Sequence, residues 1–101
     1  MPVMKPSNLY VKIAVTGTAV QFTSAVTKCR KMIVRARSGN AAGPRVYIGG
    51  SGVTSTAASF ELAPGESVTI DPDGESVIQL DMWYVNGTAN DVVDVMPIGV
   101  V

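Results

Sequence analysis

The chain has 101 residues, a net charge of zero and 47% hydrophobic residues, which is the size and composition of one globular domain. It contains no histidine and a single cysteine, Cys29. The usual general base and the usual zinc ligand are therefore missing, and neither a Cys-His nucleophile nor an intrachain disulfide can form.

The beginning of the chain differs from the rest. Pro2 and Pro6 disfavour regular structure over residues 1–8, so we expect an N-terminal arm there. Residues 9–101 hold the alternating apolar segments and the turn signals, without a linker or a repeat. We therefore expect one domain over 9–101.

Short segments rich in valine and threonine predict strands rather than helices. The alternation of apolar and polar residues is clearest over 9–16 and 28–37, where Met32, Val34 and Ala36 share one face. In chain order we expect strands over 9–16, 19–23, 28–37, 45–48, 60–62, 67–70, 76–85 and 91–98.

Turn signals separate these segments. Pro64-Gly65 predicts a type II turn, in which the glycine takes a positive φ. Asn86-Gly87 predicts a tight hairpin between the last two strands. About seven or eight short strands with turns between them predict an all-β fold, either an antiparallel β-sandwich or a small barrel. Of the two, we expect a single antiparallel β-sandwich of jelly-roll or immunoglobulin-like type.

Three short motifs resemble functional sites, but each lacks an essential part. Asp71, Asp73 and Glu75 alternate as in a calcium loop, without its further ligands or flanking helices. The glycine-rich residues 49–52 are not followed by the Lys-Ser/Thr pair of a phosphate loop. Cys29 has cationic neighbours but no histidine to activate it. We expect no enzyme activity, no metal and no cofactor.

The charges are segregated along the sequence. All eight basic residues lie between Lys5 and Arg45, and all eight acidic residues lie between Glu61 and Asp94. One interpretation is pairing of opposite charges across strands, and the other is a molecule with one basic and one acidic face. The second interpretation predicts a partner-binding surface. Its candidate residues are Arg30, Lys31, Arg35 and Arg37, with Tyr47 as a possible aromatic anchor.

Composition also bears on partners and location. The zero net charge disfavours general nucleic-acid binding, which goes with an excess of basic residues. No segment of the sequence approaches the roughly 20 apolar residues of a membrane span, and the N-terminal residues lack the apolar core of a secretion signal. We expect a protein that is made in a reducing cytoplasm and does not enter a membrane.

Three segments resemble small virion proteins of tailed bacteriophages, of the head decoration or cement type. They are GTAVQFTSAVTKCRKMIVRAR, VYIGGSGVTSTAASFELAPGESVTI and IQLDMWYVNGTANDVVDVMPIG, within residues 13–99. The resemblance implies a β-sandwich on the outer surface of a phage capsid. It implies the major capsid protein as partner, and a homotrimer that bridges and stabilises neighbouring capsid subunits.

Two other functions remain open from the sequence. Similar modules serve in tails, baseplates and head fibres, so a tail or fibre component is the first alternative. A carbohydrate-binding β-sandwich is the second, because such modules expose aromatic rings to sugars. The aromatic residues available for that role are Tyr10, Tyr47, Trp83 and Tyr84.

Overall fold

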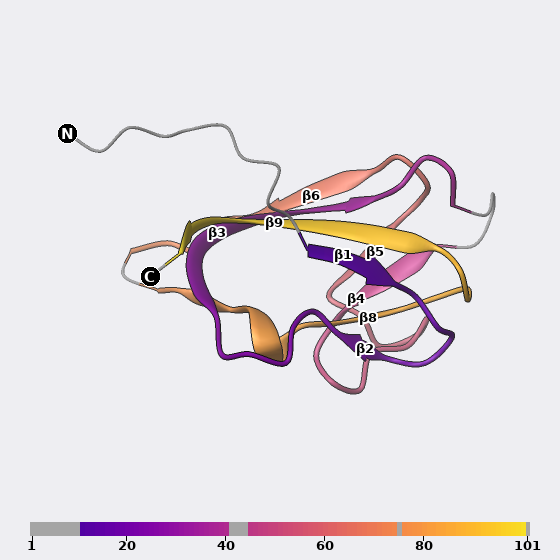
Figure 1. The fold of residues 1–101 in the computed structure, drawn as a ribbon, viewed down its shortest axis with the longest axis horizontal. Coiled ribbons are helices and arrows are strands. Elements are labelled where there is room, and N and C mark those ends of the chain that lie inside the picture. Colours follow the sequence, from indigo (N-terminus) through magenta and orange to yellow (C-terminus); the bar gives the residue numbers. More distant parts are fainter. Residues whose placement is uncertain (1–10, 41–44, 75, 101) are drawn as a thin grey trace.

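The computed structural model describes residues 11–40, 45–74 and 76–100, in which two antiparallel sheets pack face to face (Figure 1). These ranges contain no α-helix. The predicted all-β sandwich is confirmed. The expected N-terminal arm, residues 1–8, lies outside the described residues.

Nine strands and one 3₁₀ turn make up the sandwich in the described ranges. The strands are β1 (Val11–Ala14), β2 (Val20–Gln21), β3 (Lys28–Ala36), β4 (Val46–Gly49), β5 (Phe60–Leu62), β6 (Ser67–Ile70), β7 (Ile78–Gln79), β8 (Tyr84–Asn86) and β9 (Val92–Val100). The 3₁₀ turn, η1, spans Leu80–Met82. Sheet A has the order β1-β9-β3-β6, with β7 also paired to β3, and sheet B has the order β2-β8-β4-β5.

The pairing of strands is mostly non-local. Of these strands, only β4 and β5 pair with each other as neighbours in sequence. Every ladder joins one of β1–β4 to one of β5–β9. Most connections therefore cross from one sheet to the other.

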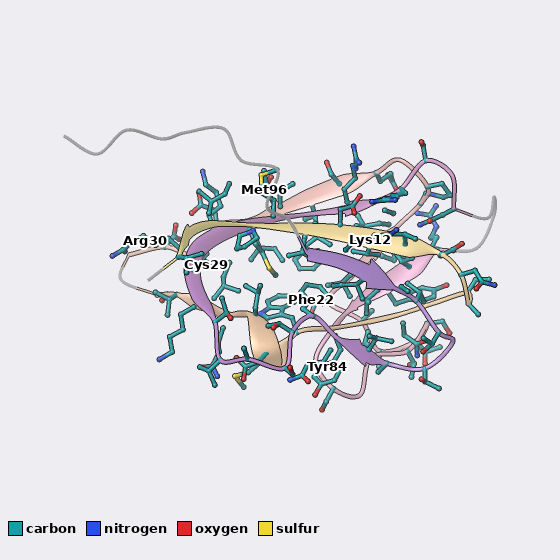
Figure 2. All side chains as sticks on the ribbon, in the orientation of Figure 1. Lys12, Phe22, Cys29, Arg30, Tyr84 and Met96 are labelled. Carbon is teal, nitrogen blue, oxygen red and sulfur yellow. The ribbon has the colours of Figure 1, made fainter. Side chains whose placement is uncertain are left out.

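The core lies between the two sheets, because alternate residues of each strand point inward. Phe22 enters this layer from the end of β2, as Figure 2 shows. Valine, isoleucine and leucine side chains make up most of the buried set. The buried cluster contains Ile13, Val15, Phe22, Cys29, Met32, Val34, Ala36, Val46, Ile48, Leu62, Ile78, Leu80, Val85, Val93 and Val95.

The expectation of one long strand over 76–85 is wrong. The segment forms β7, η1 and β8 instead, and it passes from sheet A to sheet B. The bend is fixed by hydrogen bonds: Leu80 N donates to Thr27 O (2.8 Å), and Gln21 Nε2 donates to Asp81 O (2.7 Å). The bend lets Trp83 pack against the core, stacked on Phe60 at 6.5 Å between ring centroids.

The hairpin predicted at Asn86-Gly87 is also absent, because β8 and β9 belong to different sheets. The Asn86 side chain is used locally instead: its Oδ1 accepts from Gly87 N (2.7 Å), and its Nδ2 donates to Val53 O (3.1 Å). The turn at Pro64-Gly65 forms as predicted. Gly65 has φ +85°, and Glu66 N donates to Ala63 O (2.9 Å).

In the described part of the chain, no helix has the length and apolar character needed to cross a membrane.

Candidate functional site

The outer face of sheet A brings together basic and apolar side chains from three strands. Lys12 on β1 lies opposite Asp94 on β9, and Asp94 lies opposite Arg35 on β3. In the next row along these strands, Met96 lies opposite Ile33. Because side chains alternate between the two faces of a strand, all five point away from the core.

We call this surface the sheet A face. Its side chains are exposed or half-buried, apart from the carboxylate of Asp94. Figure 2 shows Met96 on this side of the molecule and Tyr84 on the opposite side. The sheet A face comprises Lys12, Ala14, Lys31, Ile33, Arg35, Arg37, Val92, Asp94, Met96 and Ile98.

Asp94 organises the centre of the face. Arg37 binds it with both arms of its guanidinium group: Nε donates to Oδ2 (2.9 Å) and Nη2 donates to Oδ1 (3.0 Å). Arg35 adds a longer contact from Nη2 to Oδ2 (3.3 Å). The hydrogen bonds from Arg37 lower the pKa of Asp94, against the opposing effect of burial, and Arg35 lowers it further.

The described charges of the sheet A face do not balance. Four cations and one carboxylate give it a net charge of plus three. The other described acidic residues lie elsewhere, in sheet B, in η1 or in the connections: Glu61, Glu66, Asp71, Asp73, Asp81 and Asp91. Four of the basic residues that are clustered in the sequence therefore form one basic surface in the structure. Cross-strand pairing accounts for Arg35 and Arg37, which share Asp94.

One end of the sheet A face is hollowed. The hollow has a volume of about 390 Å³ and is lined by Arg35, Arg37, Ser38, Gly39, Asn40, Gly65, Asn90 and Val92. Asn40 holds one wall of the hollow in place, because its side-chain amide pairs with the backbone of Val92 as a neighbouring strand would. Asn40 Nδ2 donates to Val92 O (3.0 Å), and Asn40 Oδ1 accepts from Val92 N (2.8 Å). We call it the arginine hollow.

The structure separates the sequence-predicted contact residues. Lys31, Arg35 and Arg37 share the sheet A face, whereas Arg30 lies at the end of the molecule where β3 bends (Figure 2). Gly99 faces Arg30 with φ +67°, and a Cβ on Gly99 would lie 3.3 Å from Arg30 Cβ.

Tyr47 lies on the other side of the sandwich. It is half-buried on the outer side of sheet B, directly opposite Asn86 and Glu61. The connection between β4 and β5 folds over this side, since Val53 is buried against Gly49. A second hollow of about 290 Å³ results, which we call the tyrosine hollow. It is lined by Arg45, Tyr47, Thr54, Ser55, Asn86, Gly87 and Thr88.

Cys29 belongs to the core rather than to a reactive site. Its side chain is fully buried, and burial raises the pKa of its thiol. A raised pKa keeps the thiol protonated and a poor nucleophile near neutral pH. Among residues 11–40, 45–74 and 76–100, no three histidine, cysteine or acidic side chains are grouped so as to hold a metal ion.

Lys12 and Asp94 on the sheet A face were not among the predicted contact residues. The alternation over 9–16 already places Lys12 on the outer side of its strand, but the register that sets it beside Asp94 and Arg35 depends on β9 lying between β1 and β3.

A comparison of the chain with protein-family models, curated proteins and solved structures finds no match.

Proposed function

We propose that the protein is a structural virion protein that decorates the outer surface of a bacteriophage head. The observation that carries this proposal is the sheet A face, a continuous strand-built surface with a net charge of plus three and exposed apolar side chains. Such a surface suits docking on another protein, because it combines charge for orientation with apolar area for burial. The sequence resemblance to decoration proteins supports the same function.

The mechanism is burial of surface across a subunit boundary. A copy that contacts two neighbouring major capsid subunits adds its interface to theirs, so that separating the subunits also exposes this added area. A homotrimer fits this role, because a symmetric oligomer matches a local symmetry axis of a capsid. Size-exclusion chromatography with light scattering checks it, and a monomer at micromolar concentration would contradict the trimer.

The location is tested by labelling virions with an antibody against the protein. Label over the head supports decoration, and label on the tail or fibres supports the alternative of a tail, baseplate or fibre component. Absence of the protein from purified virions would overturn both.

The docking face is tested on particles that lack the protein. The double variant Lys12→Glu, Lys31→Glu should bind them at least tenfold more weakly, because it reverses charge on the sheet A face and breaks no described ion pair. Arg37 is unsuitable for this test, since it holds Asp94. The double variant Lys28→Glu, Arg30→Glu is the matched control, because it makes the same charge change outside the face: Lys28 pairs with Gln79 on β7, and Arg30 lies at the end of the molecule. An equal effect of both changes would contradict the assignment.

The tyrosine hollow favours carbohydrate binding as a second candidate function. It combines an aromatic ring at Tyr47 with the hydroxyl groups of Thr54, Ser55 and Thr88. An aromatic ring covers the apolar side of a sugar, and hydroxyl and amide groups pair with the sugar hydroxyls. Binding on a glycan array that is lost in Tyr47→Ala would support this function, and an array without signal would exclude the glycans it displays.

A further inference from the structure

The arginine hollow has the chemistry of an oxyanion site. Two arginines and no acidic residue are found among its described lining residues. The charge of Asp94 is shared by both guanidinium groups, and its side chain is only 11% exposed. The group of Arg35, Arg37 and Asp94 therefore keeps a net positive charge at the edge of the hollow.

Arg35 is the available donor. Its side chain is 59% exposed, and its single hydrogen bond among the described side chains is the 3.3 Å contact to Asp94. A guanidinium group carries five N–H donors in a planar fork that matches the two oxygens of a carboxylate. Arg37 is held more firmly by its two bonds to Asp94, so it fixes the position of the carboxylate that Arg35 also contacts.

The rim of the hollow supplies neutral donors. Ser38 and Asn90 line it from the two connections on either side, and both are exposed. Asn90 is held in a left-handed conformation, with φ +76° and its backbone N–H bonded to Val15 O (2.9 Å). A hydroxyl group and an amide beside a guanidinium group complete a set of donors for one carboxylate.

We propose that the arginine hollow receives an acidic side chain, Asp or Glu, from the protein surface on which the sheet A face docks. The identity of the partner rests on the proposed function. The binding site for a carboxylate rests only on the residues of the hollow. The incoming carboxylate pairs with the outward side of Arg35 and takes further hydrogen bonds from Ser38 and Asn90. Lys12 and Lys31 attract the surrounding acidic surface, and the hollow fixes its register.

The test uses the purified protein alone, titrated with a hexaglutamate peptide that is acetylated and amidated at its ends, and followed by ¹⁵N NMR. The expected result is a set of shifts confined to Arg35, Ser38, Gly39 and Asn90. Arg35→Gln should weaken binding about tenfold or more, and Arg35→Lys should weaken it less, because lysine keeps the charge but loses the fork. Arg30→Gln makes the same charge change at the far end of the molecule and should leave binding within about twofold.

A second variant probes the hollow without changing an arginine. Gly39 lines it, has no positive φ, and a Cβ there meets no atom within 4 Å. Gly39→Glu should therefore fold normally and compete with the peptide, weakening its binding as much as Arg35→Gln does.

Equal effects of Arg35→Gln and Arg30→Gln, or no shifts in the hollow, would overturn the site. Either result would leave the virion location to be decided by antibody labelling. Conversely, peptide binding at the hollow of a protein that is absent from virions would overturn the proposed function and retain the site.

Discussion

At the scale of single residues, Met32 is the most informative core position. It is fully buried on β3 between Pro97 of β9 and Ile70 of β6. Met32→Ala should lower the free energy of unfolding by about 2–5 kcal/mol, because it removes apolar contacts and leaves a cavity. Met82 is the matched control: it is 64% exposed, and Met82→Ala should change stability by no more than about 0.5 kcal/mol. Urea unfolding measures both, and similar losses would contradict the described core.

The pKa of Asp94 makes stability depend on pH. The folded-state pKa lies below the unfolded value of about 3.9, so ionised Asp94 stabilises the fold above that pH. This contribution is lost as the pH falls from about 4 through the lowered pKa. Asp94→Asn should cost about 1–3 kcal/mol at neutral pH and remove this part of the acid dependence.

Unfolding midpoints measured between pH 5 and pH 2 check the Asp94 prediction. Asp73→Asn is its control, because Asp73 is exposed in the connection before β7 and forms no ion pair among the described residues. A mutant protein that keeps the acid dependence of the wild type would show that Asp94 is not its source.

At the scale of elements, the connection from β4 to β5 depends on a glycine. A Cβ on Gly49 would lie 3.3 Å from Val53 Cγ2 and 3.4 Å from Ser59 N, on the side of sheet B that this connection covers. Gly49→Ala should displace the connection and cost about 1–3 kcal/mol. Gly50→Ala is the control, since a Cβ there meets no atom within 4 Å.

Thermal unfolding measures the cost of the Gly49 change, and limited proteolysis between residues 50 and 59 reports displacement. Unchanged protection of this segment in Gly49→Ala would show that Val53 does not hold it in place.

The sequence predicted most strands because their burial alternates. Ile13 and Val15 are buried while Lys12 and Ala14 are exposed, as the pattern over 9–16 requires. The same reasoning failed over 76–85, where the apolar run continues through a bend that is held by distant partners, Thr27 and Gln21. Local patterns carry no information about such partners.

Less of the candidate site than of the fold could be predicted from the sequence, because the site also depends on partners that are distant in the sequence. Alternation alone places Arg35 and Arg37 on one side of β3, and in the structure both contact Asp94, which the sequence did not indicate. Strict alternation would place Arg30 on the inner side with Met32, but Arg30 is exposed at the end of the molecule because β3 bends near its start. Tyr47 lies in the other sheet, which no feature of its own strand reveals.

At the scale of the whole molecule, the sandwich offers two separate outer sides. The basic sheet A face and the tyrosine hollow lie on opposite sheets. A copy that docks through sheet A would therefore leave the tyrosine hollow open to solvent. Binding of particles and binding of a glycan should then be independent, which can be measured by titrating both ligands together.

The ladders between β1–β4 and β5–β9 determine when the two sheets can form during synthesis. During synthesis, the described strands β1–β4 leave the ribosome with no ladder among themselves, and β1 has no strand partner until β9 is made. Folding of the sandwich should therefore begin only after strands from β5–β9 have been made. Separate fragments 1–56 and 57–101 should each lack β-sheet signal in circular dichroism and regain it when mixed, because each supplies every second strand of both sheets.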